Sequence, residues 1–289
     1  MKVLILGLGH VGKAVAAKLK QDGHTVVGTT TTPAKVAELE TLVDQVFVLK
    51  GAETDKVAAA AQGCDAIIAT VAPNVRNTRT KEEREVHYHE ALELSCQSAA
   101  QACPRVIFLS SFSVYGDGGE DSAPISELTP TSNHEEPSSK YYQKAEQQVL
   151  ANEQGCVLRF PDMYGAPGDI DFPQRVKMAI EYFGGKAIFG ADAPLYAIHF
   201  NDVVSSVYHA LTNDLTGTYN VCDNDNIPET NKTVFDAICD DNGWARLEFL
   251  NQIKAPNRKI SADKFYATGY KVAHGDPNAE VVAKAKASA

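Results

Sequence analysis

The sequence lacks several features that would place it in a particular class of proteins. Its six cysteines are scattered, mostly beside apolar residues and never at CxxC spacing. Neither a zinc site nor a disulfide framework is indicated, and we expect no metal site. No run of basic residues occurs, and 37 acidic against 27 basic residues give a formal net charge of −10. This balance argues against nucleic acid or an anionic membrane as a partner.

Two further absences concern membranes and export. No apolar stretch approaches the length that spans a bilayer. The chain opens directly on a strand-like run instead of a charged segment followed by an apolar one, so no secretory leader is predicted. Together with the unpaired thiols, these observations predict a cytoplasmic protein that acts on a small molecule.

Strand-like apolar runs alternate with helical patterns through most of the chain. Such alternation produces parallel βαβ units, and continuous apolar runs indicate strands covered on both faces. The prediction is an α/β fold, a doubly wound parallel sheet of Rossmann type with a smaller discontinuous C-terminal substrate lobe. Predicted strands are 2–6, 25–29, 45–49, 65–70, 105–109 and 156–160; predicted helices lie near 10–22, 33–42, 54–61, 82–101, 138–153, 171–182, 201–213 and 229–242.

The predicted domain division follows from a change in the alternation of strands and helices along the sequence. We expect residues 1–160 and 200–222 to form a dinucleotide-binding domain and residues 161–199 and 223–289 to form the substrate-binding lobe. After position 160 the alternation loosens into glycine-containing loops, and a further strand near 218–221 returns to the sheet. Residues beyond Gly275 are polar and rich in alanine and lysine, which indicates a frayed tail or a short terminal helix.

The opening residues, MKVLILGLGHVG, place three glycines between an apolar run and a helical pattern. In a dinucleotide fold the first glycine makes the tight turn, the second lets the backbone approach a pyrophosphate, and the third lets the helix lie close to the strand. The helix N-terminus then holds the anion. The alternative is a glycine turn with a structural role only. Predicted cofactor contacts in this segment are Gly7, Gly9, His10, Val11 and Gly12.

The loop after the second predicted strand bears on the choice of cofactor. A carboxylate there would accept the adenosine ribose hydroxyls of NAD, but residues 28–33 read GTTTTP. The hydroxyls of Thr29 and Thr30 and the charge of Lys35 can hold a 2′-phosphate, which favours NADP. NAD stays open because no arginine stands in this loop, and the threonines can equally cap the next helix.

Three further strand ends lie beside the expected nicotinamide half, because open parallel sheets bind ligands at the carboxyl ends of their strands. Small residues follow the fourth strand, hydroxyls follow the fifth in the run SSFSVYG, and an apolar pair closes the sixth. The predicted cofactor contacts at these ends are Ala72, Pro73, Ser110, Phe160 and Pro161.

Five motifs in this order resemble an extended or atypical short-chain dehydrogenase/reductase of the NAD-dependent epimerase/dehydratase type. Besides the glycines, residues 110–116 match a serine-rich segment ending in VYG, and residues 158–165 resemble the LRP…YG strand. Residues 198–203 are similar to the IHVDDV helix start, and residues 217–221 to the GxYNV strand. The resemblance implies an NAD(P)-dependent oxidoreductase, epimerase or dehydratase. Its substrate would be a small hydroxylated or carbonyl compound, with a nucleotide-sugar as one candidate.

The same resemblance implies a catalytic serine or threonine, a tyrosine and a lysine. Ser111 matches the serine that orients the substrate, and Lys144 matches the lysine that also binds the nicotinamide ribose. Four residues before that lysine the family has its tyrosine, whereas this chain has Lys140. Tyr141 shares a helix face with Lys144 at i,i+3, and a nearby ammonium lowers a tyrosine pKa from about 10. We therefore expect Tyr141 to exchange the proton.

The displaced tyrosine leaves two functions open. In one, the protein is an enzyme with an atypical Ser-Tyr-Lys site. In the other, it is a non-catalytic NAD(P)-binding sensor or scaffold that has kept the fold and lost the tyrosine. Turnover of candidate sugars or ketones separates the two.

Other polar residues have a functional and a structural interpretation side by side. His87 and His89 line the substrate cleft or lie on a solvated helix face. His199 is a base or a structural residue at a domain junction. Asp162 binds a substrate hydroxyl, acts as a substitute acid/base, or caps a loop. The cationic candidates for diphosphate contacts are Arg175, Lys177 and Lys186.

Two expectations concern regions outside the site. The loop from 117 to 137 is long enough to act as a lid. Members of the family often pair through the helices that here are 82–101 and 138–153, so the resemblance also implies a homodimer.

Overall fold

The computed structural model describes residues 1–75, 77–133 and 135–288, which fold into two compact units. The first unit comprises Met1–Val114, Asn133–Phe160 and Val203–Tyr219. The second unit comprises Tyr115–Ser132, Pro161–Asp202 and Asn220–Ala289. Each unit is therefore assembled from segments that are distant in the sequence.

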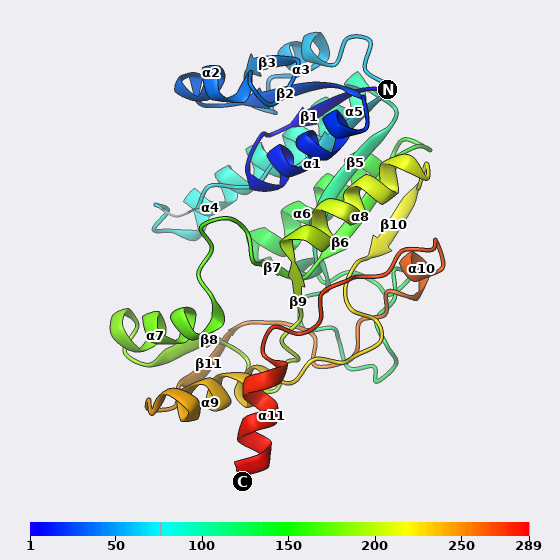
Figure 1. The fold of residues 1–289 in the computed structure, drawn as a ribbon. Coiled ribbons are helices and arrows are strands. Elements are labelled where there is room, and N and C mark those ends of the chain that lie inside the picture. Colours follow the sequence, from blue (N-terminus) through cyan, green and yellow to red (C-terminus); the bar gives the residue numbers. More distant parts are fainter. Residues whose placement is uncertain (76, 134, 289) are drawn as a thin grey trace. The chain divides into compact units, whose positions relative to one another are not determined.

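A seven-stranded sheet forms the centre of the first unit, in the order β10-β6-β5-β4-β1-β2-β3 (Figure 1). The described pairs of β1 with β2 and β4, of β2 with β3, and of β5 with β4 and β6 are all parallel. The predicted doubly wound α/β fold is confirmed. The strands are β1 (Lys2–Leu6), β2 (Thr25–Thr30), β3 (Gln45–Val48), β4 (Ala66–Ala69), β5 (Val106–Ser111), β6 (Cys156–Phe160) and β10 (Gly217–Asn220).

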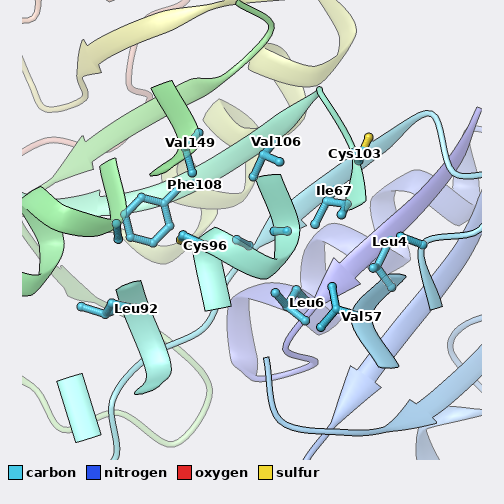
Figure 2. Packing of buried hydrophobic residues seen from close by; sticks show 14 of the residues in the cluster. Leu4, Leu6, Val57, Ile67, Leu92, Cys96, Cys103, Val106, Phe108 and Val149 are labelled. Carbon is cyan, nitrogen blue, oxygen red and sulfur yellow. The ribbon is translucent and has the colours of Figure 1, made fainter. Parts of the chain in front are cut away.

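Apolar side chains on both faces explain why the strands read as continuous hydrophobic runs. On one face, Leu4 and Leu6 of β1 join Phe108 of β5 in a cluster that also receives side chains from α3, α5 and α6 (Figure 2). Ile5 points to the opposite face, because successive side chains of a strand alternate, and meets α1 there. Helices of this unit are α1 (His10–Gln21), α2 (Val36–Leu39), α3 (Thr54–Ala60), α4 (Lys81–Tyr88), α5 (Ser95–Ala102), α6 (Pro137–Leu150) and α8 (Phe200–Thr212).

The helix predicted over 82–101 contains a wider turn than the sequence pattern indicates. It begins with a capping box between Thr80 and Glu83, as α4, and continues into the π-helical segment η2 (His89–Leu94) before α5. The Ser95 hydroxyl donates to the Glu90 carbonyl, five residues earlier, at 3.0 Å. The helix predicted over 33–42 is shorter than expected, because Pro33 opens a 3₁₀ turn and only α2 follows it.

The second unit has small sheets and its own core. Strand β7 (Asp162–Tyr164) pairs in parallel with β9 (Ala197–His199), and β8 (Lys186–Phe189) pairs in parallel with β11 (Glu248–Ile253). Apolar side chains of α7, α9 and α11, such as Val176, Ile238 and Val282, form a buried cluster. The residues after Gly275 include a terminal helix. The helices are α7 (Phe172–Tyr182), α9 (Asn231–Asn242), α10 (Asp263–Tyr266) and α11 (Ala279–Ser288).

Candidate functional site

The glycine-rich turn between β1 and α1 has a backbone that glycine adopts most readily. Gly7 has a φ of +106°, a conformation that residues with a Cβ rarely take. Its N–H donates to the Thr29 hydroxyl at 2.9 Å, and its carbonyl accepts from the Thr70 hydroxyl at 2.5 Å. The turn is therefore held from β2 and from the residue that follows β4. Sequence reasoning missed Thr70, although a hydroxyl directly after a buried strand was an available signal.

The other two glycines of the turn have contrasting surroundings. A Cβ on Gly12 would lie 2.2 Å from the Gly7 carbonyl oxygen, so only glycine lets α1 approach the turn this closely. A Cβ on Gly9 would meet nothing within 4 Å. Gly9 also provides no side-chain cap for α1, so the N–H groups of the first helical residues, starting with His10 and Val11, are suited to an anion.

The two threonines at the end of β2 make different contacts. Thr29 is buried, and its hydroxyl accepts the Gly7 N–H, so its side chain stabilises the turn. Thr30 is half-buried and accepts the Thr32 N–H at 3.2 Å. Lys35 is exposed at the end of the 3₁₀ turn. Thr30 and Lys35 are thus the two predicted contacts here whose side chains reach solvent.

The remaining predicted backbone contacts lie at strand ends. Ala72 and Pro73 follow β4 as an exposed and a half-buried residue. Phe160 is the buried last residue of β6 and pairs in register with Ser111 at the end of β5. Pro161 is half-buried and opens the next segment of the chain.

Ser110 belongs to a buried polar network beneath the site. Its hydroxyl donates to Glu146 Oε1 at 2.5 Å, and Arg159 donates to both oxygens of the same carboxylate, at 2.9 and 2.6 Å. All three side chains are buried. The network joins β5, β6 and α6, and it therefore fixes the helix that carries Tyr141 and Lys144.

Ser111 lies one residue further along β5 and is half-buried. Its hydroxyl accepts the Ser113 N–H at 3.1 Å, which starts a short 3₁₀ turn. Among the described residues, Ser111 makes no hydrogen bond to Tyr141 or Lys144. The hydroxyl of Ser111 keeps its proton available for donation, because the bond to Ser113 uses it as an acceptor.

Lys144 takes part in a polar cluster with two residues of the π-helical segment. Its ammonium lies 3.2 Å from Glu93 Oε2, and the same oxygen lies 2.9 Å from His89 Nδ1. The side chains of His89 and Lys144 are 42% and 39% exposed, whereas Glu93 is 18% exposed. A carboxylate held between two donors therefore lies beside the predicted ribose-binding lysine. Glu93 was not predicted, because its position depends on the widened turn.

Tyr141 lies between this cluster and the hydrophobic core. Its side chain is buried among the core residues of the first unit, and its ring centroid lies 5.5 Å from that of His89. The ammonium of Lys144 is 5.1 Å from the Tyr141 ring centroid. Lys140, at the family's tyrosine position, contacts Glu85 at 3.3 Å, and this hydrogen bond raises the pKa of its ammonium group. The expected pairing of Tyr141 with Lys144 on one helix face is present, as a contact with the ring.

Other candidate residues lie in the second unit. His199 stacks on His274, with ring centroids 3.8 Å apart, and Tyr164 contacts His199 edge to face. Asp202 is buried and accepts from the N–H groups of Ala273 and His274. These contacts hold the segment that precedes α11 against Asp202 and His199. The ring of His199 therefore takes part in packing within the second unit.

The three predicted diphosphate contacts are spread over α7 and β8. Arg175 forms an ion pair with Asp169 at 3.0 Å, Lys177 lies 3.7 Å from Glu181, and Lys186 is exposed. Arg175 and Lys177 thus already have carboxylate partners within the unit. Asp162, at the start of β7, is exposed.

Two features, a metal-binding cluster and a membrane-spanning helix, are absent from the part of the chain that the structure describes. No group of three His, Cys, Asp or Glu side chains is arranged to hold a metal ion there. No described helix is long and apolar enough to cross a membrane.

Comparisons with known proteins found a matching family model and a similar sequence. A sequence model of the NAD dependent epimerase/dehydratase family matches residues 3–222. Protein YeeZ of Escherichia coli (strain K12) is 26% identical over 227 residues, which cover 76% of this chain and 77% of YeeZ.

Solved structures resemble the chain over nearly its whole length. The Bordetella bronchiseptica enzyme WbmG, in complex with NAD, has a TM-score of 0.74 at 16% identity, covering 99% of this chain and 93% of WbmG. UDP-glucuronic acid 4-epimerase from Bacillus cereus, in complex with UDP-glucuronic acid and NAD, has a TM-score of 0.71 at 19% identity, covering 99% of this chain and 100% of the epimerase. At these identities the likeness establishes the fold.

Proposed function

The chain belongs to the NAD dependent epimerase/dehydratase family, and from this membership we propose that it is an NAD(P)-dependent oxidoreductase or epimerase. Its proposed substrate is a hydroxylated or carbonyl compound of the nucleotide-sugar class. The observation that carries the proposal is the turn at Gly7–Gly12, where one glycine is needed for packing and another faces open space.

The turn fits the pyrophosphate of a dinucleotide. The missing Cβ of Gly9 leaves room for the phosphate oxygens, and the N–H groups at the start of α1 can bind them. Lys144 would hold the nicotinamide ribose. When bound, the dinucleotide supplies an acceptor or donor of hydride.

The preferred cofactor in this proposal is NADP. Residues 28–35 contain no carboxylate that would accept the ribose hydroxyls of NAD. Thr30 and Lys35 have side chains that reach solvent and can donate to a 2′-phosphate. NAD is bound by the similar structures from Bordetella bronchiseptica and Bacillus cereus, so it is the natural comparison in binding experiments.

The substrate class is supported by the Bacillus cereus structure, which holds UDP-glucuronic acid. In this proposal the first unit binds the cofactor and segments of the second unit recognise the substrate. Ser111 would orient the reacting oxygen through its available proton. Helical spacing predicts that Tyr141 exchanges the proton, and the Tyr141→Phe variant tests that prediction.

A homodimer through α4, α5 and α6 is part of the proposal. Val86 on α4 and Leu150 on α6 are 56% and 39% exposed, and burial of such side chains against a second copy is favourable. Size-exclusion chromatography with light scattering would show a dimer, and a Val86→Glu variant should shift it toward the monomer.

Titration with NADPH and NADH, followed by fluorescence, tests the cofactor part of the proposal. Wild type should bind NADPH more tightly than NADH. Gly9→Ala provides a sharp comparison: because the added methyl meets no protein atom within 4 Å, stability should be unchanged while binding weakens. Saturable binding that Gly9→Ala leaves intact would place the pyrophosphate elsewhere.

Turnover is tested with NADP⁺ or NAD⁺ and UDP-glucuronic acid or UDP-glucose, by absorbance at the reduced-nicotinamide band and by separation of sugar epimers. The non-catalytic sensor is a second candidate, because Lys140 occupies the tyrosine position and is ion-paired. Tight dinucleotide binding without any change in these substrates would favour the sensor.

A further inference from the structure

Oxidation of a hydroxyl needs a side chain that takes up its proton, and the usual tyrosine position holds Lys140. Glu85 and Glu135 both accept hydrogen bonds from the Lys140 ammonium. The bond to Glu85 raises the pKa of Lys140, so this lysine stays protonated near neutral pH and cannot act as a base. Tyr141 is only 8% exposed and packs in the core, which limits access of a substrate to its side chain.

We propose that His89 is the proton-exchanging residue of this enzyme and that Glu93 positions it. The inference rests on the proposed function, since it assigns a role within that reaction. A carboxylate only accepts hydrogen bonds, so the 2.9 Å contact between His89 Nδ1 and Glu93 Oε2 requires the proton on Nδ1. The neutral ring then presents Nε2 as a bare acceptor.

The surroundings of Glu93 make this tautomer stable. The carboxylate is 18% exposed and also binds the Lys144 ammonium at 3.2 Å. It is thereby held in one orientation, as the orienting carboxylate of a Ser-His-Asp triad is. Because Lys144 is the residue that the family resemblance assigns to the nicotinamide ribose, the pair of His89 and Glu93 lies next to the proposed reaction.

Local backbone geometry contributes a second argument. His89 and Glu93 both belong to η2, the π-helical segment that interrupts the helix between α4 and α5. Single π-helical turns inside α-helices occur frequently at functional sites, where they reposition side chains. The 42% exposure of His89 leaves the ring accessible to a ligand, in contrast to the buried ring of Tyr141.

The proposed step is a balanced proton transfer. The O–H bond of the substrate hydroxyl breaks, and the proton moves to His89 Nε2. The electron pair of that bond forms the second carbon–oxygen bond of the product carbonyl, and the hydride that leaves the carbon would be taken up by the oxidised dinucleotide of the proposed function. The imidazolium that results keeps its Nδ1–H hydrogen bond to Glu93. In the reverse direction, His89 returns the proton to the oxygen.

Nitrogen-15 NMR of the histidine-labelled full chain tests the tautomer without relying on turnover. His89→Gln identifies the resonances by their loss. In wild type, the neutral ring of His89 should carry its proton on Nδ1. Glu93→Gln should change this signature, whereas Glu90→Gln should not, because Glu90 lies in the same segment but contacts Lys50. A wild-type ring protonated on Nε2 would overturn the proposal.

Kinetics with NADP⁺ and UDP-glucuronic acid or UDP-glucose test the role itself. His89→Gln should lower kcat by about 10² or more, the usual contribution of general acid–base catalysis, with dinucleotide affinity within twofold of wild type. Glu93→Gln should lower kcat by at least about tenfold with little change in KM. His24→Gln serves as the control and should have wild-type rates. His24 directly precedes β2, and its ring contacts the N-terminal amine at 3.2 Å.

The outcomes separate the two proposals. Loss of all dinucleotide binding, or binding with no turnover, overturns the proposed function and this inference with it. Wild-type turnover that His89→Gln preserves overturns only the inference. If Tyr141→Phe abolishes turnover while His89→Gln does not, Tyr141 is the proton-exchanging residue.

Discussion

Replacing Arg159 by Met should strongly destabilise the protein, since this removes one partner of a buried ion pair. Arg159 and Glu146 are 6% and 5% exposed, and the guanidinium donates to both carboxylate oxygens. Breaking a buried pair from one side costs about 3–5 kcal/mol, because the remaining charge stays buried and uncompensated. Ser110 still donates to the carboxylate at 2.5 Å, so we expect a loss at the lower end, about 3 kcal/mol.

Urea unfolding followed by far-ultraviolet circular dichroism measures this loss. Replacing both Glu146 and Arg159 by Met should be far milder than the single change, because hydrophobic replacement of a whole buried pair is often neutral. Ser110→Ala should cost about 1.5–3 kcal/mol, the range for a hydrogen bond to a charged group. An Arg159→Met protein within about 1 kcal/mol of wild type, or a double variant as unstable as the single one, would refute this account of the network.

Three further changes can be tested directly. Gly12→Ala should abolish dinucleotide binding and lower the unfolding midpoint, because its Cβ would lie 2.2 Å from the Gly7 carbonyl oxygen; normal NADPH titration would contradict this. Lys144→Ala should weaken dinucleotide binding by about tenfold, equivalent to about 1.4 kcal/mol, and unchanged affinity would discredit its assignment to the ribose. Burial and the neighbouring His274 lower the pKa of His199 in the folded state. At a pH between this lowered pKa and the unfolded pKa of about 6.5, the His199 ring is protonated mainly in the unfolded chain. Stability should therefore fall as the pH decreases through this window, and thermal unfolding from pH 7.5 to 5 should show a smaller fall for His199→Phe; equal slopes would exclude His199 as the source.

Much of the first unit could be predicted from the sequence, because its signals are local. The apolar runs at 2–6 and 156–160 form strands with the predicted bounds. The glycine turn is recognisable because steric limits on φ and on close packing act between residues only a few positions apart. The helix predicted over 138–153 appears as α6 with nearly the same bounds, opened by Pro137 at its first turn.

Features that depend on long-range contacts were not predictable in this way. Ser110 is predicted to contact the cofactor, and only the structure shows that its hydroxyl also donates to Glu146, a residue 36 positions later. Thr70 reaches back 63 positions to the Gly7 carbonyl. Since no local pattern records which distant polar group a side chain will face, both partnerships became visible only in the fold.

The sequence by itself determined the fold class and the dinucleotide fingerprint, because hydrophobic periodicity and glycine stereochemistry are properties of short segments. Only the tertiary structure decided which polar side chains meet. The π-helical turn brings Glu93 between His89 and Lys144, although these residues come from two different helical regions. Their contact depends on the packing of α6 against that turn, which is a consequence of the whole core rather than of any one segment.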